Sequence, residues 1–208
     1  MKKLLTCTSL FLLAASITVS AKADTLGINF TSPGTQFTNG EWSLGYSFTT
    51  VNAINVTGLG FFDDGTVLAD THAVGLYDSS GTLLASTTVG PTSTQVGFFE
   101  FNSITPLALA AGGTYQVVAE TGPDVYAYDT GGFTVDPNIA FDQDEYISSS
   151  TLQFATISDG ITAADGGAWF GANFEEGSVA ATPEPSSLML LGTGVLSAAG
   201  MIRRRLSK

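Results

Sequence analysis

The chain is almost without cysteine, and its central part is without lysine or arginine. Of 208 residues only Cys7 is a cysteine, and it lies close to the N-terminus. Residues 24–182 therefore have no disulfide, no thiol nucleophile and no cysteine metal site, so their stability must come from a packed core. All seven basic residues lie outside this stretch, and they are Lys2, Lys3, Lys22, Arg203, Arg204, Arg205 and Lys208.

The same stretch is strongly acidic. It holds eighteen of the nineteen acidic residues, which gives a formal charge of −18 over its 159 residues. A surface without cations cannot neutralise phosphates, which argues against nucleic acid and anionic lipid as partners. Intrinsic disorder is the competing explanation for such acidity, but the stretch is rich in Phe, Tyr, Val, Leu and Ile, which disordered acidic chains lack.

Residue types suited to catalysis are also scarce. The single histidine, His72, is interpreted as a loop residue beside Asp70 rather than as a general base, and no serine lies in a G-x-S-x-G elbow. Two carboxylates at a set separation can hydrolyse glycosides, but eighteen acids offer such pairs by chance. We therefore expect a protein that is not an enzyme. A glycoside-active enzyme is kept as a third hypothesis, after the two given at the end of this section.

The N-terminal segment 1–23 is typical of a secretory signal peptide. Lys2 and Lys3 precede an apolar stretch over 4–19, and Ala21-Lys22-Ala23 fits the small-x-small cleavage pattern. We predict cleavage before Asp24, and an uncleaved N-terminal anchor is the alternative. The segment indicates an exported protein.

A second apolar stretch, 188–202, is followed by Arg203, Arg204 and Arg205. Fifteen helical residues span about 22 Å, against a hydrocarbon core of about 30 Å, so this stretch is a marginal membrane anchor. The arginines would stay on the cytoplasmic side. The order of Pro183-Glu184-Pro185, apolar stretch and basic cluster resembles the PEP-CTERM sorting signal over 182–208.

That resemblance implies processing by membrane-embedded proteases called exosortases, in Gram-negative bacteria that make extracellular polysaccharide. It predicts that the protein is held in the inner membrane through 188–202 and then released to the cell envelope or the extracellular matrix. It says nothing of what the central domain does.

The central stretch predicts an all-β fold. It contains 21 glycines, about twice the usual frequency, and no long helical period. Residues 42–48 alternate large apolar with small residues, which predicts a half-buried strand. The four residues Asp78-Ser79-Ser80-Gly81 predict a tight hairpin with Gly81 at a positive φ. Further strands are expected at 54–62, 73–77, 83–89, 96–101, 115–120, 125–128, 151–157 and 169–174.

We therefore predict a single antiparallel β-sandwich or jelly roll over 24–181, flanked by a signal helix and a short transmembrane helix. Residues 58–65, 74–84 and 111–115 resemble an uncharacterised β-sandwich domain that is common in exported bacterial proteins. The likeness covers about 42–120, and it leaves open whether the last third completes the same sandwich.

Two kinds of binding site are expected. Clustered carboxylates suit calcium, which prefers oxygen ligands, and the two clusters are Asp142, Asp144 and Glu145, and Asp63 with Asp64. Solvated acidic loops are the alternative. Flat aromatic side chains beside polar ones suit carbohydrate, and the candidates are Tyr126, Tyr128 and Trp169, with core packing as the alternative.

The first hypothesis is a non-enzymatic exported surface or extracellular-matrix protein, sorted and processed through its tail. The second is a carbohydrate-binding module for extracellular polysaccharide.

Overall fold

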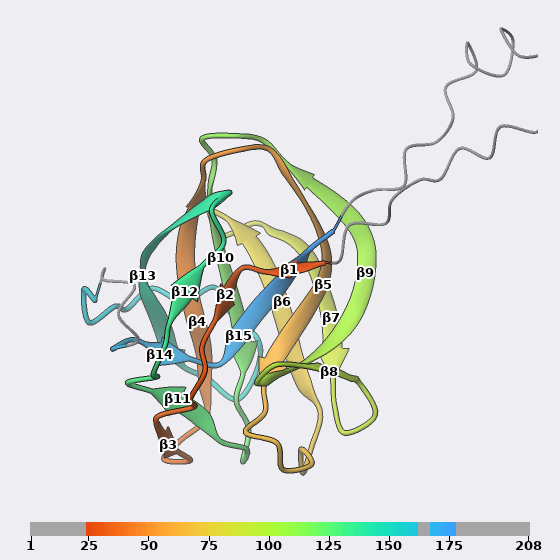
Figure 1. Cartoon of the computed structure of the whole chain (residues 1–208). Helices are drawn as coiled ribbons and strands as arrows, with labels where there is room; N and C mark the ends of the chain where they lie inside the picture. Colours follow the sequence, from red (N-terminus) through yellow and green to blue (C-terminus); the bar gives the residue numbers. More distant parts are fainter. Residues whose placement is uncertain (1–23, 162–166, 178–208) are drawn as a thin grey trace, which may run out of the picture.

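Two five-stranded antiparallel sheets face each other in the computed structural model, which describes residues 24–161 and 167–177 (Figure 1). The first sheet has the order β1-β15-β5-β9-β8 and the second has the order β13-β4-β10-β6-β7. Two small sheets, β14-β11-β3 and β12-β2, lie beside them. The described residues contain no helix, so the predicted all-β class is confirmed.

The bounds of the strands are β1 Thr25–Leu26, β2 Ile28–Asn29, β3 Thr35–Phe37, β4 Trp42–Thr50, β5 Ile54–Phe62, β6 His72–Asp78, β7 Leu83–Val89, β8 Thr94–Val96, β9 Phe99–Leu109, β10 Thr114–Glu120, β11 Tyr126–Tyr128, β12 Thr134–Val135, β13 Ile139–Ser148, β14 Trp169–Phe170 and β15 Ala172–Glu176. In the ranges 24–161 and 167–177 no helix could cross a membrane. The predicted signal helix and the predicted transmembrane helix lie outside these ranges.

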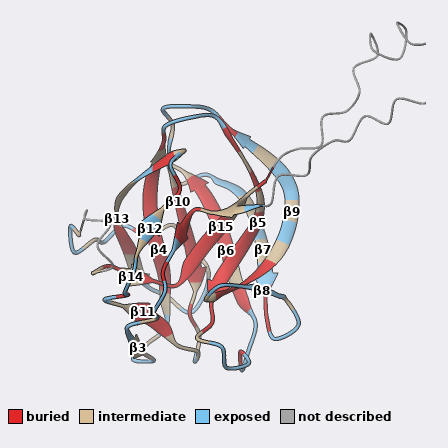
Figure 2. Cartoon of the chain, in the orientation of Figure 1, coloured by how far each residue is buried: buried red, intermediate tan, exposed pale blue. Residues whose placement is uncertain are grey.

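The core lies between the two sheets, whose buried segments are red in Figure 2, and nine of the 24 residues in its main cluster are aromatic. Phe48 of β4 meets Phe174 of β15 across the sheets, with 4.8 Å between ring centroids. Phe61 of β5 stacks on His72 of β6 at 3.8 Å. All four side chains are fully buried. Large aromatic side chains bury the most apolar area per residue, which suits a domain that has no disulfide in its central part.

Strand β4 is buried on both faces, which corrects the expected half-buried strand at 42–48. Its large side chains face the core as the alternation predicts, and its small ones lie under a covering segment. The Ser43 hydroxyl donates to the carbonyl of Thr151 and accepts from the amide of Gln153. The small residues of the pattern therefore mark a covered face and not a solvated one.

The covering segment is the expected strand at 151–157, which the structure shows not to be a strand. It lies on the second sheet, and its backbone bonds to side chains instead of to a neighbouring strand. The Gln116 side-chain amide donates to the Ala155 carbonyl and accepts from the Ala155 amide. One isolated bridge joins Ile157 to Tyr146.

The last third of the domain completes the same sandwich. Strand β13 forms the edge of the second sheet beside β4, and β15 lies inside the first sheet between β1 and β5. Two expected strands are each divided in the structure. Residues 96–101 form parts of β8 and β9 with a turn at Gly97, and 169–174 form β14 and part of β15, divided at Gly171.

The predicted hairpin at 78–81 is confirmed between β6 and β7. The Asp78 carboxylate accepts from the amides of Ser80 and Thr82, and Gly81 has φ +84°. A side chain is strained at such a φ, so glycine is the residue that suits this position.

Candidate functional site: an aromatic pocket at one end of the sandwich

The three aromatic side chains expected to bind carbohydrate lie together. Trp169 of β14 pairs with Tyr128 of β11, and their rings are 4.3 Å apart. The ring of Tyr126 is 5.8 Å from that of Trp169. Tyr126 is only 4% exposed, whereas Tyr128 and Trp169 are half-buried. The pair Tyr126 and Tyr128 is therefore not an open platform, because Tyr126 is largely covered.

Tyr126 and Trp169 instead form part of a pocket of about 200 Å³. Trp42, at the start of β4, and Tyr146 of β13 also line it, and their rings meet edge to face at 5.9 Å. Leu44 contributes the remaining apolar side chain of the lining. Four aromatic rings from four strands thus surround one small space.

The polar side chains of the pocket hold these rings in place. The carboxylate of Asp159 accepts from the Tyr146 hydroxyl at 2.7 Å and from the indole Nε1 of Trp169 at 2.9 Å. Asn39 accepts a hydrogen bond from the Tyr126 hydroxyl. Asp159 and Asn39 are exposed, so their free lone pairs face solvent.

Hydrogen bonding and burial change the acidity of the two tyrosines. The bond to Asp159, reinforced by burial, raises the pKa of Tyr146 above its usual value. Burial raises the pKa of Tyr126. Both hydroxyls therefore stay protonated at neutral pH and act as donors.

Sequence reasoning missed Trp42, Tyr146, Asp159 and Asn39 as members of this site. The sequence places Trp42 in an expected strand, but it places Tyr146 in no expected element. Asp159 follows the expected strand at 151–157. No spacing rule links these positions, because they meet only when β4, β11, β13 and β14 assemble.

The carboxylates proposed for calcium are divided by the pleat of β13. Asp144 is fully buried and accepts from Ser158, whereas Glu145 accepts from Gln143 on the opposite face. Asp142 accepts from the hydroxyl of Thr49 at a bulge in the strand. An acidic run inside a strand therefore sends its oxygens to two sides, and sequence analysis had not expected a strand here.

The second acidic pair forms a turn. The Asp63 carboxylate accepts from the amide of Gly65, and the Asp64 carboxylate accepts from the amide and hydroxyl of Thr66. Across 24–161 and 167–177 no group of three or more His, Cys, Asp or Glu side chains is arranged to hold a metal. Calcium binding stays a prediction, and these turns account for the local geometry without an ion.

The prediction is tested by thermal melting of the protein in NaCl and in calcium. The domain repels itself because its charge is −18, so we expect salt to raise the melting temperature by screening. A specific calcium site would add to that rise at matched ionic strength. A calcium effect no larger than that of NaCl would contradict such a site.

Burial raises the pKa of five carboxyl groups, those of Asp63, Glu100, Asp144, Glu145 and Glu175. The folded state then binds more protons than the unfolded state above about pH 4, the ordinary pKa of these groups. The stability that these groups contribute is complete below that pH and is lost as the pH rises through the raised values. We therefore expect the domain to melt higher at about pH 5 than at pH 8.

Asp144 is the sharpest test of this pH dependence, because its second carboxylate oxygen is buried and has no hydrogen-bond partner among the described residues. Replacing Asp144 with asparagine removes a buried charge, so we expect a higher melting temperature at pH 8 and a flatter pH profile. Asp78→Asn is the matched control, for which we expect a change of melting temperature in the opposite direction. Turn hydrogen bonds lower the pKa of Asp78, so its replacement should destabilise the domain at pH 8. If Asp144→Asn lowered the melting temperature at pH 8, this account of the charge would be wrong.

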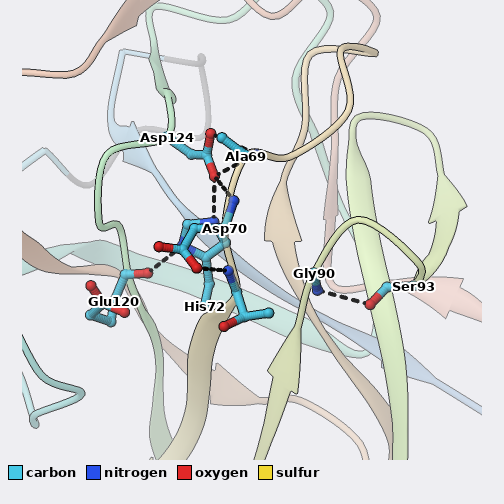
Figure 3. Close-up of polar contacts among 8 residues, drawn as sticks. Ala69, Asp70, His72, Gly90, Ser93, Glu120 and Asp124 are labelled. Atoms are coloured by element: carbon cyan, nitrogen blue, oxygen red, sulfur yellow. Dashed lines mark hydrogen bonds and ion pairs between the residues drawn. The ribbon is translucent and has the colours of Figure 1, made fainter.

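His72 belongs to a second polar site, and it does not line the pocket (Figure 3). It is fully buried at the start of β6, so its interpretation as a loop residue is wrong. Its Nε2 lies 2.8 Å from the carboxylate of Asp124, and its Nδ1 lies 3.0 Å from the carbonyl of Glu120. Each ring nitrogen thus has one protein partner within hydrogen-bond distance. The contact with Asp124 is the one contact between a basic and an acidic side chain within salt-bridge distance in the described part of the chain.

Asp124 also connects two loops. Its carboxylate accepts from the backbone amides of Ala69 and Asp70, at 3.1 Å each. Figure 3 shows Asp124 between this backbone and the ring of His72. Every polar atom of His72 is thus used internally, and its ring is covered on one face by Phe61. The arrangement suits a structural contact that holds the loops between β5 and β6 and between β10 and β11.

These features define an all-β sandwich domain with an aromatic pocket and an internal polar contact. The chain belongs to the family described as a domain of unknown function (DUF4082), whose model matches residues 22–167. The match extends beyond the likeness seen over 42–120 and includes β13. No curated protein and no solved structure matches the chain.

A second family model, described as the PEP-CTERM protein-sorting motif, matches residues 181–205. It confirms the resemblance found at Pro183, Glu184, Pro185 and the arginine cluster, and these residues lie outside the described ranges. The motif marks an exported protein whose sorting depends on an exosortase. The cleavage of segment 1–23 stays a prediction.

Proposed function

We propose that the protein is a non-enzymatic component of the cell surface or extracellular matrix, released there after exosortase processing of its tail. The sorting motif at 181–205 carries this proposal, because it assigns a destination and a processing route. Among the residues that the structure describes, Asp159 is the single carboxylate in the lining of the pocket, and glycoside hydrolysis needs two, which supports a role without catalysis. Fractionation of native cells tests the proposal. Recovery of the protein in the envelope or matrix supports it, and recovery in the cytoplasm contradicts it.

Carbohydrate binding through the pocket is the second candidate function, and the aromatic lining favours it. Sugar rings pack their apolar faces on aromatic side chains and bond their hydroxyls to neighbouring polar groups. The indole Nε1 of Trp42 is buried near the Tyr126 hydroxyl and makes no hydrogen bond of normal geometry to any residue that the structure describes. A ligand oxygen in the pocket would satisfy this donor. Asp159 and Asn39 provide acceptors beside it.

We expect Trp169→Ala to weaken binding of polysaccharide about three- to tenfold, since one aromatic contact contributes about 0.5–1.5 kcal/mol. A glycan array probed with the full chain, with and without calcium, identifies the sugar. Phe154→Ala is the matched control, because Phe154 is a half-buried aromatic packed on Tyr77 away from the pocket. If the two variants bound equally well and melted at the same temperature, the pocket would not be the binding site.

A further inference from the structure

The pocket combines aromatic rings with a carboxylate. Two indole and two phenol rings line it, and Asp159 is the only carboxylate among the lining residues that the structure describes. The faces of aromatic rings are electron-rich, so a cation placed over them is attracted, most strongly by tryptophan. A carboxylate at the edge of such a cage adds a full opposite charge. This lining is therefore complementary to a positively charged ligand.

The rest of the domain strengthens that complementarity. Residues 24–182 contain no lysine or arginine, so no side chain of that kind neutralises Asp159. Tyr146 and Trp169 each donate one hydrogen bond to it, and a carboxylate has about four lone-pair sites. Acceptor capacity is left for a ligand, and Asp159 is exposed. An acidic sugar would meet repulsion both here and from the surrounding charge of −18.

We propose that the pocket binds an organic ammonium group, presented by an amine-bearing sugar of a polysaccharide or by a small quaternary ammonium compound. The inference rests on the binding role proposed for the same pocket and names its ligand chemistry. The volume of about 200 Å³ is below the roughly 300–1,000 Å³ of sites for drug-sized ligands, so it suits one sugar ring or one methylated ammonium head.

The two tryptophans of the chain, Trp42 and Trp169, both line the pocket, so intrinsic tryptophan fluorescence reports on its occupancy without a label. The full chain is titrated with a glucosamine tetramer that has free amines, with its fully N-acetylated form, with a neutral glucose tetramer and with choline. We expect the free-amine tetramer to bind at least about tenfold more tightly than the acetylated form, because a charge-assisted contact is lost on acetylation. Choline distinguishes the two sources. Binding of choline as tight as that of the amine tetramer assigns the site to the ammonium group alone.

Asp159→Asn should reduce the affinity for the free-amine tetramer about tenfold or more. The affinity for the neutral tetramer should fall much less, because asparagine keeps an oxygen acceptor and removes only the charge. Glu41→Gln is the matched control, because Glu41 is an exposed acid next to Trp42 that does not line the pocket. Tyr146→Phe removes one hydrogen bond to Asp159 and keeps the charge. A loss with Tyr146→Phe as large as that with Asp159→Asn would show that Asp159 acts by positioning rings and not by its charge, and would overturn the proposal.

The remaining outcomes separate this inference from the function on which it rests. Equal binding of the amine, acetylated and neutral tetramers would overturn the ammonium proposal and support carbohydrate binding in general. No change of fluorescence with any ligand, in a protein that melts cooperatively, would overturn both. Neither result bears on export and sorting, which depend on 181–205.

Discussion

Replacing Asp124 with alanine should lower the free energy of unfolding by about 3 kcal/mol. Leaving a buried polar group without its partner costs about 1–3 kcal/mol, and we take the upper end because the Asp124 side chain, which is 14% exposed, has three partners. The change leaves the fully buried ring of His72 facing no carboxylate, and it leaves the amides of Ala69 and Asp70 without their acceptor. For a domain of this size the melting temperature should fall by about 6–12 °C.

The matched control is Asp70→Ala, two residues from His72. Asp70 is exposed, and its carboxylate accepts one hydrogen bond, from the amide of Thr71. Its replacement should change the free energy of unfolding by at most about 0.5 kcal/mol. Chemical denaturation of the two variants measures the difference in their free energies of unfolding. Equal midpoints for Asp124→Ala and Asp70→Ala would show that the contact between His72 and Asp124 contributes nothing beyond a surface carboxylate.

Much of the sandwich could be predicted because its central strands follow simple patterns. Strands β5 and β7 coincide with the expected ranges, and the hairpin at 78–81 has the glycine that its turn needs. These segments combine apolar or β-branched residues with clear turn signals, so local sequence alone indicates their bounds.

The missed strand β13 shows why the rest could not be predicted. It contains Asp142, Asp144 and Glu145, residue types that are depleted in strands, and the acidic run predicted a metal-binding loop instead. Its place in the sheet depends on pairing with β4, which is far away in sequence. Likewise, 151–157 has strand-like residues, but Gln116 and Ser43 take its backbone hydrogen bonds. In both segments, contacts with residues that are distant in sequence determine whether a strand forms.

The same limit applies to the two polar sites. Tyr126, Tyr128 and Trp169 could be predicted as binding residues from their side-chain chemistry. Nothing in the sequence around Asp159 indicates that its carboxylate bonds to two rings of the pocket. The sequence likewise places His72 beside Asp70, but its partner is Asp124, 52 residues away. Pairs of this kind are formed by the packing of the sheets.

The other large expected effect concerns the tail. The protein recovered from its native host should end near 183–187, because an exosortase removes the apolar stretch and the arginine cluster that follow. The stretch 188–202 is barely long enough to span the membrane and contains Gly192, Gly194 and Gly200. Each glycine destabilises a helix by about 1 kcal/mol relative to alanine, so this short stretch would form a weak permanent transmembrane helix.

The flanking residues suit a temporary anchor. Moving each of Arg203, Arg204 and Arg205 to the bilayer centre costs about 2.5–3.5 kcal/mol on insertion scales, so we expect the cluster to keep the chain from being pulled through before it is processed. Proline disfavours a helical conformation of the residue before it, so we expect the sequence Pro183-Glu184-Pro185 to oppose a helix before the apolar stretch, which suits entry into a protease site. The tail can thus hold the protein and then be removed.

Mass spectrometry of the C-terminus measures the outcome directly. Replacing Pro183, Glu184 and Pro185 together with alanine should leave chains that end at Lys208 and stay in the membrane fraction. The matched control replaces three residues of the body instead, Thr92, Ser93 and Thr94, in the turn and strand around β8, and should be processed as the unaltered protein is. Intact chains ending at Lys208 from the unaltered protein, in a host that has the exosortase, would show that the tail is not removed, and would favour a permanent anchor over a temporary one.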